Sequence, residues 1–203
     1  MKLSWLPPSL AFVAILSVAR AAEPVADEAR WKASLDAFVH VLEGTAEKDA
    51  LDKLLSDHSW VAPFARNRTE SVAVLPAMLD GMRVVSARAC LQPSVTSATD
   101  LVADVIADPS IADAVRRKLV PADGRDLRQA DATMARWFTL ALDAQPGDPV
   151  ALVAMYRDAE EAADGNAGKP ASLMLLLVRG EFTPSGTPRI SRVLYGTLEA
   201  AVR

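Results

Sequence analysis

The chain of 203 residues contains one cysteine and two histidines. A single cysteine, Cys90, excludes an intrachain disulfide, so the packing of the core must hold the fold together. A zinc site needs two or three nitrogen or sulfur ligands at helical or hairpin spacing, and Cys90 with His40 and His58 supplies no familiar pattern. No Gly-x-Ser-x-Gly motif and no nucleotide-binding motif is present either. We therefore predict neither a bound metal nor a cofactor.

The first 21 residues have the order of a cleavable secretory signal peptide. Lys2 provides a positive start, and the apolar stretch 10–19 provides a hydrophobic region. Alanines on both sides of Arg20 match the small residues that signal peptidase requires, which places cleavage between Ala21 and Ala22. We expect a mature chain of residues 22–203 that forms a single domain.

An uncleaved membrane anchor is the alternative interpretation of this N-terminus. A spanning helix needs roughly 20 apolar residues, and prolines at positions 7 and 8 interrupt this segment. No cysteine directly follows the apolar stretch, so no residue there could carry a lipid, and no twin arginine precedes it. The pattern therefore favours an exported product, periplasmic or secreted, with no stable membrane span after cleavage.

Basic charge is scarce in the mature chain. Removal of residues 1–21 takes away Lys2 and Arg20 and leaves 20 basic and 26 acidic residues, a formal net charge of −6. The one basic cluster, residues 116–118, follows apolar residues at helical spacing, and cations are favourable in the last turn of a helix. A nucleic-acid partner is therefore not expected.

Helical patterns dominate the first part of the mature chain. Residues 27–42 place Trp31, Leu35, Phe38 and Leu42 on one helical face, and Gly44 ends the pattern. Thr45 is predicted to cap a short second helix whose apolar face is formed by the leucines at 51, 54 and 55. A further short helix is expected to end at Gly81, with a kink or interruption at Pro76.

The middle of the chain predicts one strand and two more helices. In residues 82–91 the uncharged positions Val85, Ala87 and Ala89 share an alternating face with Arg83 and Leu91, which favours a strand. A capping-box pattern follows, formed by Ser97 and Asp100. The dipeptide 108–109, Asp-Pro, is predicted to start a helix whose apolar residues at 111, 115 and 119 stack until Pro121.

The last third contains short apolar runs separated by turns. Residues 150–156 and 173–179 are compact apolar segments, and a long turn over 183–188 leads to a third segment over 190–196. Residues 132–143 fit either a helix or a strand, and their aromatic and β-branched content tilts toward a strand. The predicted architecture is an α+β fold in which N-terminal helices pack on a curved antiparallel sheet of three or four strands, formed mainly by the C-terminal third.

This order of elements resembles the nuclear-transport-factor-2-like (NTF2-like, SnoaL-like) superfamily. The resemblance is carried by residues 147–153, 173–179 and 188–196 and covers the last third of the chain. It implies a cone in which a curved sheet wraps around the N-terminal helices and encloses a pocket. The helical segment 97–119 would be an insertion or an extension relative to that simple pattern. The superfamily has no diagnostic motif, so the resemblance assigns no functional residue.

Several side chains are candidates for a catalytic role. Asp36 and His40 lie on the first helix, where a helix stripe could place them near a pocket mouth, although a solvated His40 is favoured. His58 and Ser59 are adjacent, and adjacent residues rarely present both side chains to one reacting centre. Cys90, in an apolar run, is expected to be a small core residue.

The remaining candidates are aromatic, acidic or glycosylation positions. Trp60, Trp137 and Tyr156 could line a pocket but are more typical of core. Three acids of the connector over 159–168 are typical of a solvated surface; they are Glu160, Glu161 and Asp164. Residues 67–69 form an N-glycosylation sequon, which matters only in a eukaryotic secretory route.

Three classes of function fit these observations. The favoured one is a non-catalytic domain that binds a small apolar or weakly polar ligand or a partner protein. An isomerase or hydrolase of the same architecture would need a buried acid or histidine on an inward-facing strand position. The predicted strands 82–91 and 173–179 contain arginines and no acid, which disfavours an enzyme. A structural homodimer would instead expose a large apolar patch.

Overall fold

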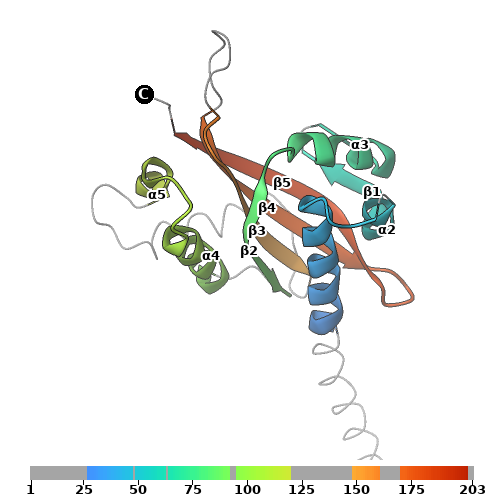
Figure 1. Cartoon of the computed structure of the whole chain (residues 1–203). Coiled ribbons are helices and arrows are strands. Elements are labelled where there is room, and N and C mark those ends of the chain that lie inside the picture. The colour runs from blue at the N-terminus through green and yellow to red at the C-terminus, as the bar shows by residue number, and fades with distance from the viewer. Residues whose placement is uncertain are drawn as a thin grey trace, which may run out of the picture.

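The structure is a computed structural model that describes residues 27–47, 49–62, 64–91, 95–119, 148–160 and 170–200. These residues form the predicted α+β fold, with helices packed on a sheet (Figure 1). The predicted signal peptide, its cleavage site at Ala21 and Ala22, the segment 132–143 with Trp137, and the acids Glu161 and Asp164 lie outside the described residues.

Helices and strands are mixed along the first part of the described chain, and the last three elements are strands. After a helix whose described part covers 27–42, the elements are α2 (Ala50–Leu54), β1 (Leu55–Val61), α3 (Arg68–Met78), β2 (Arg83–Cys90), α4 (Val95–Ala107), α5 (Asp113–Leu119), β3 (Val150–Arg157), β4 (Ala171–Phe182) and β5 (Pro188–Ala200). The five strands form one sheet in the order β1-β5-β4-β3-β2. Strand β1 runs parallel to β5, and the other neighbours are antiparallel, so the sheet is mixed.

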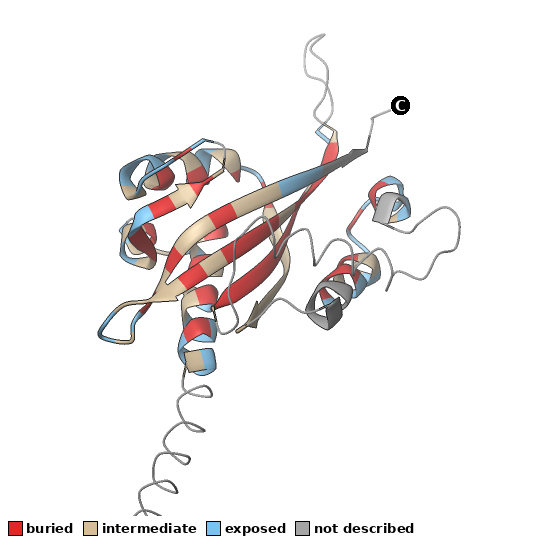
Figure 2. Cartoon of the chain, turned by 180° about the vertical axis from the view of Figure 1, so that it is seen from behind, coloured by how far each residue is buried: buried red, intermediate tan, exposed pale blue. Residues whose placement is uncertain are grey.

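Two hydrophobic cores lie on opposite faces of this sheet. The inner core joins the first helix, α2 and α3 to one face, where Ala151, Val153 and Met155 of β3 lie. The outer core joins α4 and α5 to the other face, where Leu152 and Tyr156 lie. Because successive strand residues point to opposite faces, β3 supplies both cores and is buried along almost its whole length (Figure 2).

The first helix forms as the sequence predicts. Trp31, Leu35, Phe38 and Leu42 are all buried in the inner core, as expected for residues on one helical face. Gly44 follows with φ of 69°, a left-handed conformation that favours glycine and ends the helix. The prediction for this helix is confirmed.

Strand β1 is the main element that sequence analysis missed. The structure places Leu55 at the start of this strand, paired with Ile190, whereas the leucine pattern predicted a helical position. Polar residues in the middle of β1 hide the alternation, so only pairing with β5 defines it as a strand. The predicted cap is also wrong, because the Thr45 hydroxyl donates to the carbonyl of His40 and so closes the first helix, while α2 begins after Asp49.

Helix α3 spans Pro76, which lies in its last turn. Its N-cap is Asn67, whose side-chain oxygen accepts a hydrogen bond from the Glu70 amide at 2.9 Å. Gly81, with φ of 72°, follows the helix as predicted. A proline near the end of a helix deprives it of one hydrogen bond only, which explains why the helix continues to Met78.

Strand β2 is confirmed, but the residues predicted to share one of its faces lie on two different faces. The register with β3 shifts between Val84 and Ser86, which leaves Val85 as a bulge. Beyond the bulge, Ala87 packs against the inner core, whereas Val85 packs against the outer core. A bulge adds one residue and therefore reverses which residues face which side.

The starting residues predicted for the two helices on the outer face are wrong, since neither Ser97 nor Asp108 caps a helix. Helix α4 starts at Val95, so Ser97 lies within it. Helix α5 starts at Asp113, and Asp108 instead forms a turn in which its carboxylate accepts a hydrogen bond from the Ser110 amide. The apolar positions are as predicted, since Ile111 and Val115 are fully buried in the outer core.

The C-terminal strands and their turn are confirmed. Apolar runs predicted over 150–156 and 173–179 lie in β3 and β4, and the segment over 190–196 lies in β5. The turn over 183–187 joins β4 to β5, with Gly186 at φ of 75°. The sheet contains five strands where three or four were expected, because β1 adds to the edge of β5 in parallel.

Candidate functional site

The space between the first helix and the sheet is filled by side chains of the inner core. Among the described residues, the buried polar side chains are four serines, Ser56, Ser59, Ser71 and Ser172, and no acid or histidine is among them. A general acid or base with a strongly shifted pKa needs burial. The described interior therefore offers no group of that kind.

An open hollow lies at the end of the inner core, and we call it the apolar hollow. It has a volume of about 220 Å³. Its wall includes the end of the first helix, one residue of α2, the end of α3 and the residues before β2; these are residues 41–44, 51, 75, 76 and 79–82. The floor consists of Leu42, Leu51, Leu75, Leu79 and Met82, all of them members of the inner core.

The rim of the apolar hollow carries negative charge. Glu43 and Asp80 line it, both are exposed, and no basic residue is among the described residues that line it. The turns at Gly44 and Gly81, both with positive φ, bring the two helix ends together at this rim. The arrangement suits a ligand with an apolar body and a cationic head, because carboxylates attract an ammonium group while leucines cover the hydrocarbon.

A second, polar depression lies on the same side as α2 and α3, and we call it the polar cleft. Its volume is about 420 Å³, and it lies between the start of β1 and the turn between β4 and β5. Its lining is residues 55–58, 68, 181–184 and 189. Sequence analysis gave no signal for this cleft, since its walls come together only through the pairing of β1 with β5.

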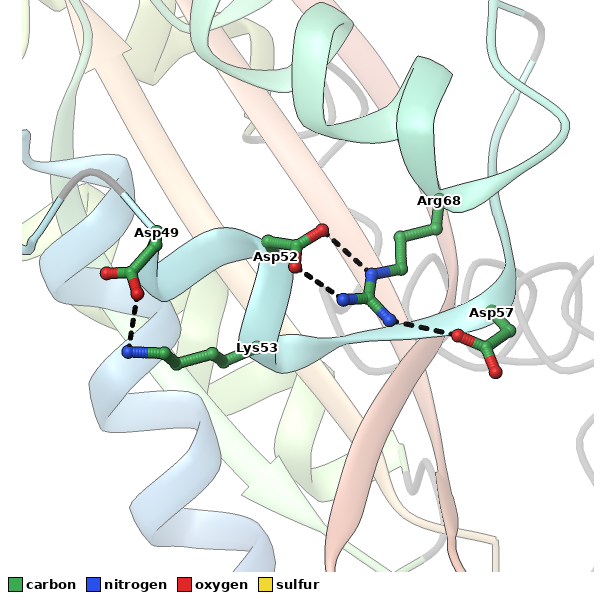
Figure 3. Close-up of polar contacts among 5 residues, drawn as sticks. All are labelled: Asp49, Asp52, Lys53, Asp57 and Arg68. Atoms are coloured by element: carbon green, nitrogen blue, oxygen red, sulfur yellow. Dashed lines mark hydrogen bonds and ion pairs between the residues drawn. The ribbon is translucent and has the colours of Figure 1, made fainter.

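Arg68 connects three elements beside the polar cleft (Figure 3). Its Nε donates to Asp52 at 2.8 Å, a second nitrogen also bonds Asp52, and Nη1 donates to Asp57 at 2.9 Å. Asp52 belongs to α2 and Asp57 to β1, and Arg68 is the first residue of α3. The guanidinium fork therefore fixes the relative positions of these three short elements.

The protonation states follow from these contacts. The hydrogen bond from Arg68 lowers the pKa of Asp52 below its ordinary value of 3.8. The same bonds raise the pKa of Arg68 further above its ordinary value, so the guanidinium stays charged. A neighbouring pair on α2 behaves alike, because the hydrogen bond from Lys53 lowers the pKa of Asp49.

A third depression, of about 470 Å³, lies between the first helix, β2 and α4. On its wall the Asp104 carboxylate accepts hydrogen bonds from Ser86 at 2.6 Å and from Arg88 at 2.6 and 3.2 Å. The bond from Ser86, followed by those from Arg88, lowers the pKa of Asp104. These contacts attach α4 to β2, so we assign them a structural role.

The structure separates the catalytic candidates of the first helix and of β1. Asp36 and His40 are exposed, Asp36 at the third depression and His40 beside Thr45. His58 lines the polar cleft, whereas Ser59 is buried and its carbonyl accepts a bond from Ser71. His58 and Ser59 therefore face different surroundings and do not form a nucleophile and base.

The remaining candidates have structural positions. Tyr156 is buried in the outer core, where its hydroxyl oxygen accepts a hydrogen bond from the Ala112 amide and burial raises its pKa. Trp60 lies beneath the guanidinium of Arg192, 5.7 Å from ring centroid to Cζ. Cys90 is half-buried against the outer core. Glu160 is exposed.

Comparisons with protein-family models, with curated proteins and with solved structures return no match. Among the described residues, no cluster of three or more histidines, cysteines or acids has the geometry of a metal site. No helix in the described part of the chain is long and apolar enough to cross a membrane.

Proposed function

We propose that this protein is an exported, non-catalytic binding protein that holds a small ligand in the apolar hollow. The ligand class we infer has a short hydrocarbon body and a cationic head, such as an alkylammonium ion. The observation that carries the proposal is the pairing of a leucine floor with the two rim carboxylates of Glu43 and Asp80. With about 220 Å³, the hollow is smaller than the roughly 300–1,000 Å³ that larger ligands need.

The NTF2-like resemblance is part of this proposal. It is supported by N-terminal helices packed on one face of the sheet and by a hollow that opens at their end. The helices α4 and α5 then form an addition on the opposite face. A binding role is favoured over an isomerase or hydrolase because, among the described lining residues, the ionisable groups are exposed carboxylates, and acid catalysis at neutral pH needs a buried one.

The homodimer alternative has less support. It requires a large exposed apolar patch, and among the described residues the one exposed large apolar side chain is Phe64. Phe64 is 56% exposed and stacks on Tyr195, with ring centroids 5.9 Å apart. One aromatic pair buries too little area for a stable dimer, which needs about 800 Å² on each partner.

Three four-carbon probes test the proposed ligand class: n-butylammonium, n-butanol and butyrate. Each is titrated into ¹⁵N-labelled protein, and the amides of Gly44 and Gly81 report binding because both residues line the hollow. We expect butylammonium to bind most tightly and butyrate most weakly. Equal affinity for butyrate, or amide shifts confined to other regions, would overturn the proposal.

Two variants separate the floor from the rim. Val41→Phe fills the hollow and is expected to abolish binding of both butylammonium and butanol. The double change Glu43→Gln with Asp80→Asn removes both rim carboxylates, each of which contributes about 0.5 kcal/mol through its attraction for the ligand ammonium. It should therefore weaken butylammonium binding about fivefold and leave butanol binding unchanged. Asp36→Asn, an exposed acid on the same helix outside the hollow, is the matched control.

A further inference from the structure

The polar cleft shares no lining residue with the apolar hollow, so it is a separate candidate site. Its volume of about 420 Å³ lies within the range of small-molecule sites. Arg68 forms one wall, but its guanidinium is already held by Asp52 and Asp57. The groups that remain for a ligand are on β1, at the end of β4 and at the start of β5.

Two opposite charges on the hairpin face the same side of the sheet. Glu181 and Arg189 are directly opposite each other in the register of β4 and β5, and both line the cleft. Side chains so placed have Cβ atoms roughly 5 Å apart. Among the described residues, no ion pair within 4 Å joins Glu181 to Arg189 or holds either of them. A half-buried carboxylate and guanidinium are therefore both available.

A third polar group in the cleft lacks a partner. Ser56 is 5% exposed, it lies in the cleft wall, and its hydroxyl oxygen has no hydrogen-bond partner among the described atoms. A buried hydroxyl without a partner costs free energy, so such groups are rare unless a ligand satisfies them. A ligand that reached this hydroxyl would give it the missing partner.

We propose that the polar cleft binds a small zwitterion of the amino-acid class. Its ammonium group pairs with Glu181, its carboxylate pairs with Arg189, and one of the two bonds the Ser56 hydroxyl. The positive charge of Arg189 also contributes to the lowered pKa of nearby Asp52. The ligand side chain lies toward Pro184, which also lines the cleft.

The test compares L-alanine with its two half-ligands, propionate and ethylammonium. Propionate lacks the ammonium and ethylammonium lacks the carboxylate, while both keep the hydrocarbon part. Binding to the ¹⁵N-labelled protein is followed at the amides of Ser56 and Thr183, which line the cleft. We expect L-alanine to bind at least about tenfold more tightly than either half-ligand, because each half loses one charge pair with the cleft.

Glu181→Gln and Arg189→Gln should each weaken L-alanine binding at least about fivefold, while Asp36→Asn leaves it unchanged. Ser56→Ala is expected to change stability and affinity in opposite directions, which the loss of a purely structural serine would not do. It removes an unsatisfied hydroxyl, so the free protein should melt at the same or a higher temperature, yet its affinity for L-alanine should fall.

The proposal is wrong if either half-ligand binds as tightly as L-alanine, or if the amides that shift are those of Gly44 and Gly81. It is also wrong if L-alanine does not bind, or if Glu181→Gln leaves its affinity unchanged in a variant with an unaltered melting temperature. Binding in the apolar hollow is read at Gly44 and Gly81 and binding in the polar cleft at Ser56 and Thr183, so the failure of one proposal leaves the other standing.

Discussion

The contact between Trp31 and Gly180 gives the sharpest prediction for stability. The indole of Trp31 is fully buried, its Nε1 donates to the carbonyl of Val150 at 2.8 Å, and its ring lies against Gly180 of β4. A Cβ added at Gly180 would lie 2.6 and 2.8 Å from two ring carbons of Trp31 and 3.1 Å from the Arg189 carbonyl. Real Cβ atoms do not approach so closely, so the ring or the strand must move.

Gly180→Ala should therefore destabilise the protein by about 1–3 kcal/mol, the usual cost of overpacking a well-packed core. Gly196→Ala is the matched control, because Gly196 lies in β5 and a Cβ there meets nothing within 4 Å. At such a position alanine stabilises a strand by roughly 0.5–1 kcal/mol relative to glycine. The two glycine-to-alanine changes are thus expected to have opposite signs.

Urea denaturation followed by tryptophan fluorescence measures both effects. With a slope of about 2 kcal/mol per molar, Gly180→Ala should lower the midpoint by about 0.5–1.5 M, and Gly196→Ala should raise it slightly. Trp31→Phe removes the ring carbons that clash, so the double variant Trp31→Phe with Gly180→Ala should be more stable than the two single effects sum to. Equal midpoints for the two alanine variants would refute the contact.

Two further predictions concern carboxylates that attach helices to the sheet. Because Arg68 lowers the pKa of Asp52, the stability that this carboxylate contributes is present above pH 3.8 and is lost as the pH falls through the lowered value. The urea midpoints of wild type and Asp52→Asn should therefore differ at pH 6 and converge as the pH falls below 3.8, and a constant difference would contradict this. Asp104→Asn should destabilise the protein by about 1 kcal/mol, because Asp104 is partly exposed and loses its charged hydrogen bonds with Ser86 and Arg88. Asp100→Asn is the control, since Asp100 makes only one longer contact with Arg88 and should have a smaller effect. Equal melting temperatures of the two variants would contradict the structural role of Asp104.

Elements whose signal is local were predictable from the sequence. The first helix follows from the spacing of Trp31, Leu35, Phe38 and Leu42 by four, three and four residues, since one helical face must be apolar to pack. Strands β3 and β4 follow from short apolar runs bounded by turn residues. These patterns depend on neighbours within a few positions, so they need no knowledge of the fold.

The candidate sites were not predictable in this way. The apolar hollow uses leucines that any core would contain, and the polar cleft unites β1 with a hairpin more than 120 residues later. Neither Arg68 nor Glu181 has a neighbour in sequence that suggests a role. Asp52 and Asp57 precede Arg68 by 16 and 11 positions, with no local pattern that links them, and only the register of the β4–β5 hairpin sets Glu181 opposite Arg189.

The sequence by itself therefore determined the α+β class, the amphipathic first helix, the C-terminal strands and their turn, because hydrophobic periodicity and turn chemistry are local. Tertiary structure decided that residues 55–61 form a strand parallel to β5, that the bulge at Val85 divides the faces of β2, and that Arg68 joins α2 to β1. These features depend on backbone pairing and charge contacts between distant segments, whose free energy exists only once the sheet has formed.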